Sequence, residues 1–343
     1  MTPLRWIPSI VGPFAVMAVW TGTAAYAADP VRAEKIADAI VFTVGGKEFC
    51  RYQIAETVAK PYFYPLIAPN GAKVTRGWPM EKGLPDETTD HIHQKSAWFC
   101  HGDVIPKGLE LKVKSSDKRV EGIDFWSETP NHGKIVCVHV GEIQTLSSNH
   151  LSVPTKNEWR APDGTKILDE IREIHLLSLP AGRLLVLNID FHASVCPICF
   201  GDTKEGALGV RVNDSIRELK GKTAGAGTMV NPAGERGEKT LWGQEAAWID
   251  YFGPISGKTA GIAVFDASMN PHKAAWHARG YGLLAANPFG RSRSGFPSRK
   301  DRHDLVKLQK GEHLKFRYGI YVHDGDTKEG KVAEAYQAFE QLK

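Results

Sequence analysis

Hydrophobic and polar positions alternate along much of this chain. The alternation is clearest in residues 184–192 and 314–322, where every second side chain is apolar. Shorter β-rich runs bounded by glycine and polar turns occupy residues 41–44, 109–113, 135–140 and 261–265. Because side chains on a strand point alternately to its two sides, a period of two indicates strands that bury one face. The sequence therefore predicts many short strands.

Only the C-terminal end has a helical pattern. Apolar residues recur there at spacings that place them on one face of an amphipathic helix, namely Val332, Ala335, Tyr336, Phe339 and Leu342. Asp326 or Thr327 is positioned to cap the start of this helix. No strand–helix alternation typical of a parallel sheet is present. We therefore predict an all-β antiparallel sandwich or barrel with a C-terminal helix.

The first 27 residues have the features of a secretory signal peptide. An apolar, small-residue run from Trp6 to Ala25 follows a single charge, Arg5, and residues 25–27 form an A-x-A cleavage site. A retained membrane anchor is the alternative, since the run approaches the roughly 20 residues that cross a bilayer. Two prolines within it, Pro8 and Pro13, favour cleavage. We expect an exported protein, periplasmic or extracellular, with one domain over residues 28–343 and no membrane segment after cleavage.

The charge pattern gives little sign of a nucleic-acid partner. The chain has 43 Lys and Arg against 39 Asp and Glu, a formal net charge of +4. The basic residues are scattered among acids, whereas nucleic-acid binding usually shows a clustered basic face. We therefore expect no nucleic-acid partner.

The five cysteines include one C-x-x-C pair, Cys196 and Cys199. Redox catalysis would place such a pair at the start of a helix after a strand, and here a turn follows instead. A zinc site would need a second pair of ligands at matching spacing, which the chain lacks. A local disulfide or two buried thiols is the favoured interpretation.

The densest candidate chemistry lies in residues 90–103. On a strand, His91 and His93 would share one face at H-x-H spacing, and His101 and Asp103 follow. As a metal site, this set suits a divalent transition ion such as zinc, iron or manganese, although the glutamate expected soon after such a pair is missing. Without a metal, the same histidines are candidate general acids or bases, with a carboxylate fixing the tautomer. The purely structural alternative is a polar loop whose histidines form hydrogen bonds with backbone groups.

Aromatic and basic residues in two further segments complete the candidate site. Trp98 and Trp126, with Asp124 beside the second, would supply stacking faces and an acid near the histidines. A second cluster contains Trp276, His277, Arg279 and Tyr281, and a third contains Asp202, Lys204, Glu205 and Arg211. Arg279 has a planar fork suited to carboxylates and to paired hydroxyls. Each cluster could equally be a structural turn or a cross-strand ion pair.

Taken together, five segments resemble the PmoA-like family of exported bacterial proteins. They are DHIHQKSAWFCHGDV (90–104), IDFW (123–126), GDTKEGALGVRV (201–212), WGQEAAWIDYFG (242–253) and WHARGYGLLAANPFG (276–290). The resemblance spans roughly residue 62 to the C-terminus. The sequence departs from the family at Gln94, where a histidine is expected, and at Cys100, Cys196 and Cys199.

The resemblance implies a fold and a ligand class. Some collections label this family methane oxygenase PmoA, but a strand-rich, charged chain cannot form the helical bundle of a membrane oxygenase subunit. The family implies a β-sandwich similar to the galactose mutarotase fold, with polar and aromatic groups on one concave face that holds a sugar.

We therefore predict a carbohydrate-binding or carbohydrate-active protein with epimerase-, lyase- or hydrolase-like acid/base chemistry. The catalytic candidates are His91, His93, His101, Asp103, Glu205 and His277, and the substrate-binding candidates are Trp98, Asp124, Trp126, Arg211, Trp276, Arg279 and Tyr281. The first alternative is a non-catalytic glycan- or protein-binding module of the cell envelope. The second is a metal-dependent oxygenase or hydrolase that uses His91, His93 and His101.

Overall fold

A computed structural model describes Met1 and residues 28–342. The predicted signal peptide therefore lies outside the described residues, apart from Met1. Within the described part of the chain, no helix is both long and apolar enough to cross a membrane.

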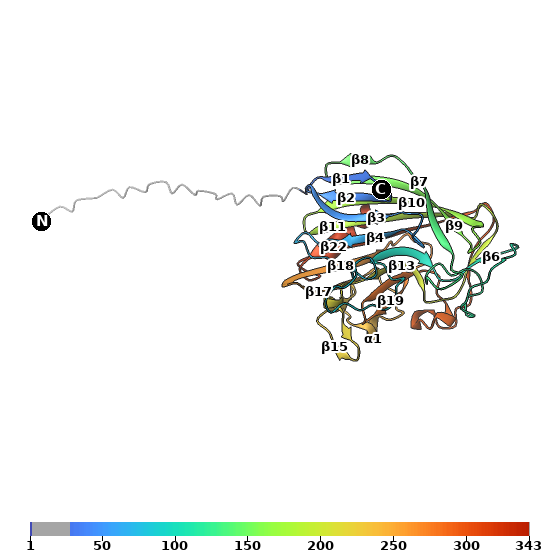
Figure 1. Cartoon of the computed structure of the whole chain (residues 1–343). Helices are drawn as coiled ribbons and strands as arrows, with labels where there is room; N and C mark the ends of the chain where they lie inside the picture. Colours follow the sequence, from blue (N-terminus) through green and yellow to red (C-terminus); the bar gives the residue numbers. More distant parts are fainter. Residues whose placement is uncertain (2–27, 343) are drawn as a thin grey trace.

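Two large antiparallel sheets form the molecule (Figure 1). The eight-stranded sheet runs in the order β1 (Val31–Lys35), β2 (Ala39–Val44), β3 (Lys47–Gln53), β4 (Tyr62–Leu66), β5 (Ala97–His101), β13 (Gly206–Arg211), β20 (Leu283–Asn287) and β19 (Ala275–Arg279). The nine-stranded sheet runs β16 (Thr228–Val230), β17 (Trp248–Ile255), β18 (Lys258–Asp266), β22 (His313–Asp324), β11 (Gly182–His192), β10 (Lys166–Leu179), β9 (His150–Arg160) and β7 (Lys134–Val140), with β8 (Gln144–Ser147) paired to β9.

Smaller elements decorate the ends of the sandwich. A three-stranded sheet consists of β21 (Val306–Leu308), β12 (Ile198–Phe200) and β6 (Val104–Pro106), and a hairpin consists of β14 (Leu219–Lys220) and β15 (Thr223–Ala224). Short helical turns are η1 (Asp214–Ile216), α1 (Glu238–Leu241), η2 (Ser292–Ser294) and η3 (Pro297–Arg299).

The main core lies between the two large sheets. In β11, the alternate residues Leu185, Leu187, Ile189 and Phe191 are all buried and pack in one cluster with residues of the eight-stranded sheet such as Phe42. The other face of β11 contributes Leu184 and Val186 to a second cluster beneath the C-terminal helix. This second burial explains why this strand is apolar on both faces near its start.

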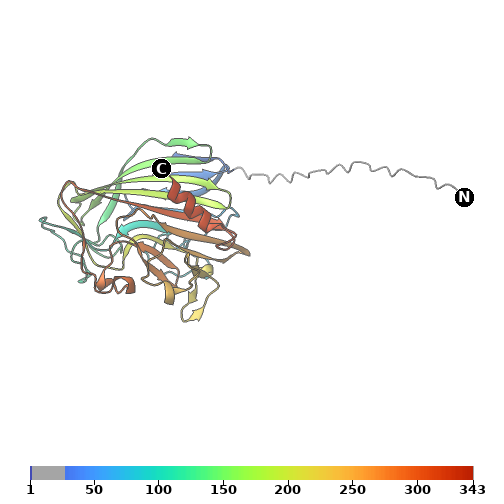
Figure 2. The same cartoon turned by 180° about the vertical axis from the view of Figure 1, so that it is seen from behind.

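Helix α2 (Val332–Gln341) lies on the outer face of the nine-stranded sheet (Figure 2). Its apolar stripe, which includes Val332, Ala335 and Phe339, contacts Phe265 and Tyr321 of that sheet. The cap prediction was wrong: Lys331, in a left-handed conformation with φ of 50°, holds the cap position without a side-chain bond. Asp326 instead accepts hydrogen bonds from Lys328 and Glu329 in the preceding turn.

The all-β sandwich with a C-terminal helix is confirmed. The strands predicted at 41–44, 135–140, 184–192, 261–265 and 314–322 are all present. The strand predicted at 109–113 was wrong, since these residues form an irregular loop that follows β6. This loop alternates in polarity because its Leu109 and Leu111 pack against the core, while Glu110 between them and Lys112 after them face solvent.

Candidate functional site

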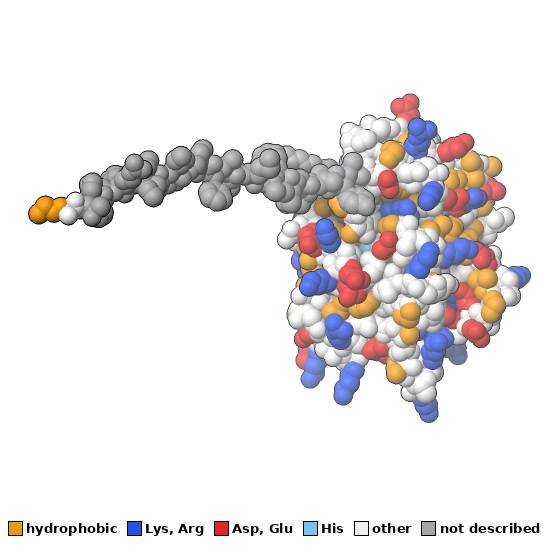
Figure 3. All heavy atoms as spheres, turned by 90° about the vertical axis from the view of Figure 1, so that its left-hand side faces the viewer, with side chains coloured by type: hydrophobic (Ala, Val, Ile, Leu, Met, Phe, Trp, Pro, Cys, Tyr) orange, Lys and Arg blue, Asp and Glu red, His pale blue; other side chains and the backbone are white. Residues whose placement is uncertain are grey.

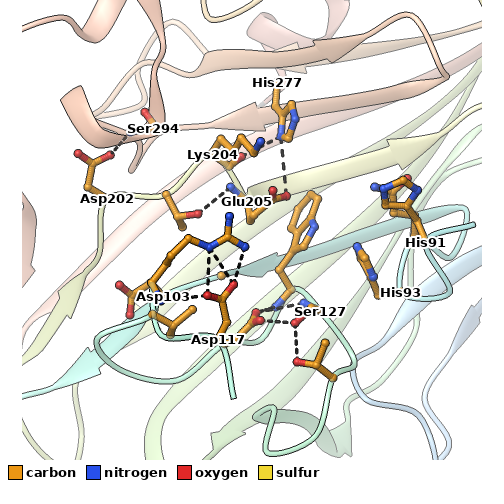
Figure 4. Close-up of a pocket in the computed structure, with 18 of the residues that line it drawn as sticks. His91, His93, Asp103, Asp117, Ser127, Asp202, Lys204, Glu205, His277 and Ser294 are labelled. Carbon is orange, nitrogen blue, oxygen red and sulfur yellow. Dashed lines mark hydrogen bonds and ion pairs between the residues drawn. The ribbon is translucent and has the colours of Figure 1, made fainter. Parts of the chain in front are cut away.

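A cavity of about 800 Å³ lies beside β5, β13 and β19, where loops from several parts of the chain meet (Figure 4). Nine of the predicted site residues line it: His91, His93, Asp103, Asp124, Trp126, Glu205, His277, Arg279 and Tyr281. His277 and Arg279 reach it together because alternate residues of β19 face the same side. Trp276 and Ala278 alternate with them and point the other way, into the main core.

Glu205 and His277 face each other in the cavity. Oε2 of Glu205 lies 4.0 Å from Nδ1 of His277, and Figure 4 shows the two side chains pointing toward one another. Desolvation raises the pKa of Glu205 above its usual value. Within the described part of the chain, the Glu205 side chain has no other ion pair and no hydrogen bond, and 35% of it is exposed. Glu205 is therefore a carboxyl group available to a ligand.

The tautomer of His277 follows from its backbone contact. Nδ1 lies 3.0 Å from the carbonyl oxygen of Lys204, which can only accept, so Nδ1 carries the proton. Burial lowers the pKa of His277 to about 3. The ring is therefore neutral near pH 7, and its Nε2 has a lone pair that makes no hydrogen bond to the described residues. His277 can accept a hydrogen bond from a ligand hydroxyl.

The other four carboxylates that line the cavity already have partners. Asp103 accepts the backbone N–H groups of Glu121 and Gly122, and Asp124 accepts those of Trp126 and Ser127. Asp202 accepts three backbone N–H groups of the 291–294 turn. Asp117 pairs with Arg119 at 2.7 Å. These acids shape loops, which leaves Glu205 as the uncommitted one among the described lining residues.

His91 and Tyr281 form an aromatic wall. Their rings are stacked, with centroids 5.3 Å apart and planes 4° from parallel. The buried guanidinium of Arg211 lies 4.7 Å from the Tyr281 ring and bonds Gln94 Oε1 at 2.7 Å. His91 has a left-handed backbone, φ 44°. Such a conformation is unusual for a residue with a side chain and is held here by the surrounding contacts.

Asp90 connects this wall to the interior. Its Oδ1 pairs with two fully buried arginines, Arg76 and Arg211, and its Oδ2 lies 3.0 Å from His91 Nδ1. Together with the hydrogen bond to His91, these cations hold the pKa of Asp90 well below its usual range, against the opposing effect of burial. The loop that carries His91 and His93 is thus anchored by buried charge.

His93 and Trp126 also line the cavity. Burial, with help from the nearby Lys60, lowers the pKa of His93 to about 3. Trp126 is almost fully buried and packs edge-on against Trp98, with centroids 5.0 Å apart. Lys60 donates to the Trp126 carbonyl at 2.8 Å and pairs with Glu128. The Trp126 segment is therefore fixed to the core.

Four predicted site residues do not line the cavity. His101 is fully buried, bonds the Gly201 carbonyl through Nε2 at 2.8 Å and contacts the Phe289 ring. Trp98 and Trp276 belong to the main core, where the Trp276 indole donates to the Ala246 carbonyl. Arg211 is behind Tyr281 and acts as its support. Sequence patterns did not separate these buried residues from their pocket-facing neighbours.

The predicted three-histidine metal set is not assembled. No group of three or more His, Cys, Asp or Glu side chains in the described part of the chain is arranged to hold a metal ion. His91 and His93 lie in a turn before β5 and not on a strand, so they do not share a strand face, and their rings contact each other edge to face at 5.7 Å. His101 lies beneath Gly206 in the core. All five cysteines, including Cys196 and Cys199, are free thiols.

Several lining residues were not predicted, namely Thr203 from the turn before β13, and Asp117 and Arg119 from the loop after β6. Asp202 and Lys204 belong to the third sequence cluster, and the structure places both beside Glu205 at the cavity. A Cβ at Gly102 would lie 2.8 Å from the Glu205 Cβ, so glycine at this position permits the close approach of the two segments. In the sequence, the only sign of this contact is that Gly102 directly precedes Asp103, a candidate acid.

Comparison with known proteins gives a family match and distant structural likenesses. A model of a family of unknown function, DUF6807, matches residues 39–337. No curated protein matches the sequence. Among solved structures, the chain is similar to an α-galactosidase from Lactobacillus brevis, at 9% identity over 91% of this chain and 42% of that one, with a TM-score of 0.41.

Two further solved structures are similar over 85% of this chain. A galactose mutarotase-like protein from Lactobacillus casei is 10% identical, fully covered and has a TM-score of 0.37. A Glycoside Hydrolase Family 97 enzyme from Pseudoalteromonas sp., in complex with acarbose, is 12% identical, 34% covered and has a TM-score of 0.31. The chain thus spans less than half the length of the α-galactosidase and of the family 97 enzyme.

Proposed function

The chain belongs to this family of unknown function, and we propose that its cavity binds a carbohydrate and performs acid–base chemistry on it. The observation that carries the proposal is the pair formed by Glu205 and His277, 4.0 Å apart in a cavity large enough for a sugar. A carboxyl group with a raised pKa is suited to both giving and taking a proton near neutral pH. The comparisons with solved structures are too distant to carry this proposal.

Glu205 is the proposed proton-transfer group. Ionised, it takes a proton from a substrate hydroxyl or an activated C–H, and protonated, it returns one, as an epimerase-, lyase- or hydrolase-like reaction requires. His277 accepts a hydrogen bond from a neighbouring hydroxyl through Nε2 and so orients the ring. Its low pKa keeps it neutral, which makes it a positioning acceptor rather than the proton donor.

The cavity walls supply the remaining contacts of a sugar site. His91, stacked on Tyr281, offers an exposed aromatic ring, whereas Trp126 lines the cavity almost fully buried and without a free ring face. Arg279, which lies 5.1 Å from the Trp242 ring and pairs with Glu238, has an oriented guanidinium for hydroxyl oxygens. A sugar ring held against His91 and beside Arg279 would expose one edge to Glu205 and His277.

The alternative is a non-catalytic glycan-binding module. The observation that favours it is that four of the five lining carboxylates are occupied by backbone N–H groups or by arginine. Such a cavity is polar and well shaped, but it holds few groups free for chemistry. The two functions differ in what they predict for Glu205.

The test is a panel of sugars with three proteins: the native chain, Glu205→Gln and the matched variant Asp117→Asn. Binding is measured by ligand-observed NMR with galactose, glucose, galacturonate and their short oligomers, and turnover by anomer exchange, by unsaturated product and by release of reducing ends. The catalytic proposal expects a bound sugar to be turned over by the native chain and by Asp117→Asn. Glu205→Gln should bind that sugar but turn it over at least about a hundredfold more slowly. Binding without turnover in all three proteins would establish the non-catalytic alternative.

We also propose that the protein is exported after cleavage behind Ala27, which the A-x-A sequence at residues 25–27 supports. The N-terminal sequence of the protein isolated from its native cell envelope or medium should begin at Ala28. An intact N-terminus would identify a membrane anchor instead. The PmoA-like resemblance stays a prediction, and we assign no methane chemistry from it.

A further inference from the structure

We propose that the cavity acts on an acidic polysaccharide, whose chain extends from the cavity along a basic surface formed by two loops. This inference rests on the proposed function for its substrate type and adds the charge and length of the substrate. The two segments are residues 107–121 and 291–310, which we call the basic rim. They lie about 170 positions apart in the sequence and adjoin the cavity through Arg119 and Arg293.

Contacts between the two segments fix them together. Arg293 Nη1 bonds Glu121 Oε1 at 2.7 Å, and its Nη2 donates to the Arg119 carbonyl. The small sheet adds a second connection, since β6, which leads into the first segment, and β21, within the second, both pair with β12. Lys107 and Lys307 both lie close enough to Cys199 for their charges to lower the pKa of its thiol, although burial raises it overall.

The basic rim concentrates the charge of the chain. Its two segments contain twelve lysines and arginines, ten of them exposed, and five acids. This excess of seven positive charges is larger than the formal net charge of +4 for the entire chain. By contrast, the face shown in Figure 3 carries acidic and basic side chains interspersed. A field of one sign beside a cavity attracts a ligand of the opposite sign.

The rim has the geometry of a track that leaves the cavity. Asp103 and Asp202 line the cavity next to the ends of β6 and β12. From there the paired strands rise about 3.3 Å per residue, which puts Lys307 of β21, opposite Cys199, one residue further out than Val306. Lys310 follows in the turn after β21. Inside the cavity, the Lys204 ammonium makes no ion pair or hydrogen bond with the described residues and is available to a ligand carboxylate.

The types of side chain exposed on the protein favour a polysaccharide over a nucleic acid as the ligand. Single-stranded nucleic acids stack their bases on exposed aromatic rings. The exposed large hydrophobic side chains of the described chain are aliphatic, namely Met1, Ile36, Leu84, Ile92, Val138, Leu146, Ile171 and Met269. The aromatic rings available at the site, His91 and Tyr281, line the cavity, where a sugar ring fits. The rim therefore favours a polymer whose charges are carboxylates on sugar rings.

The experiment compares polygalacturonate, neutral dextran and oligo-dT as probes by affinity electrophoresis or biolayer interferometry with the full mature protein. The rim variant is the triple substitution Lys300→Glu, Lys307→Glu and Lys310→Glu, all at exposed positions. The matched control reverses three exposed lysines elsewhere, Lys35→Glu, Lys47→Glu and Lys222→Glu. Both triples change the net charge equally, so only the position of the charges differs.

We expect polygalacturonate to bind more tightly than dextran, with an affinity that falls as salt is raised to about 0.5 M. The rim variant should lose about tenfold or more of this affinity at low salt, and the control variant should lose less than about threefold. Equal losses in both triples, equal binding of dextran, or tighter binding of oligo-dT would each overturn the proposal. Glu205→Gln should retain polygalacturonate, so a failure of cavity chemistry and a failure of the rim are distinct results.

Discussion

The Glu205 carboxylate lies 4.0 Å from Nδ1 of His277, yet the proton on that nitrogen is directed to the Lys204 carbonyl, 3.0 Å away. The two side chains are therefore neighbours that do not satisfy each other. A carboxyl group left without a partner in a desolvated cavity is costly to the folded protein. Such a cost is typical of residues kept for function.

Glu205→Gln should therefore raise stability while it lowers activity. Burial raises the pKa of Glu205, so the native state disfavours its ionised form. Protonated Glu205 does not carry this cost, so the stability of the protein is highest below the pKa of Glu205 in the unfolded chain. That stability is lost as pH rises through the higher pKa of Glu205 in the native state. At pH 7 the amide should thus stabilise the protein, by about 0.5 kcal/mol because solvent screens part of the cost. Urea unfolding at pH 4 and pH 7 measures this, and the stability gain should disappear at pH 4. A variant that is less stable at pH 7 would contradict the picture of an uncommitted carboxylate.

A buried ion pair beside the C-terminal helix should control stability at alkaline pH. His323 Nε2 lies 3.0 Å from Asp250 Oδ1, and both side chains are fully buried. Asp250 raises the pKa of His323 despite the opposing effect of burial, which is the largest single influence. A raised histidine pKa contributes stability that is complete below about pH 6.5 and is lost as pH rises through the native value.

Asp250→Asn should cost about 3 kcal/mol at pH 6, because it leaves the imidazolium buried without its partner. The loss should shrink between pH 6 and pH 9 as His323 becomes neutral. Guanidinium unfolding across this range provides the measurement, and Asp190→Asn, at the exposed His313 pair, is the matched control. A cost that does not change with pH would mean that the pair is not charged in the native state.

Asp90→Asn should loosen the wall of the cavity. The carboxylate compensates two buried arginines, Arg76 and Arg211, and its pKa is lowered. A lowered pKa contributes stability above the unfolded value of about 3.9, and this contribution is lost as pH falls. Because Asp90 is 45% exposed, we expect a cost of only about 1–2 kcal/mol at pH 7. Sugar affinity should fall as well, since His91 loses its anchor.

The measurements for Asp90→Asn are thermal unfolding at pH 7 and pH 3, together with sugar binding by NMR. Asp117→Asn is the control, because Asp117 pairs with an exposed arginine, Arg119. An unchanged Tm at pH 7 would show that the buried arginines find other partners.

His101 and His277 should respond differently to the same substitution. His101 is buried outside the cavity and bonds a backbone carbonyl, so His101→Gln should cost about 1–2 kcal/mol of stability and leave sugar binding unchanged. His277→Gln should weaken binding by about tenfold, since it removes the Nε2 acceptor. Both variants are assayed by thermal unfolding and by NMR titration with the sugar that binds best. Weaker binding in His101→Gln would place this residue back in the site.

Local patterns determined the strands and the final helix. In β11 and β22, apolar residues recur at every second position, as on a strand with one buried face. In α2 they recur every three to four residues, as on one face of a helix. The loop at 109–113 has the same alternation but lies beyond the end of the small sheet, with no neighbouring strand to pair with it. Pairing partners are a property of the fold, so the sequence alone could not reject this strand.

The sequence by itself also identified the segments that carry the candidate site, because histidines, acids and aromatics concentrate in them. It did not reveal that His101, Trp98 and Trp276 face the core while His91, Glu205 and His277 face the cavity. Nor did it reveal the basic rim, whose charges appear scattered until residues 107–121 and 291–310 meet. In both cases the deciding contacts join residues far apart in the chain. Composition and spacing are local quantities, whereas burial and the sum of nearby charges exist only once the sheets have packed.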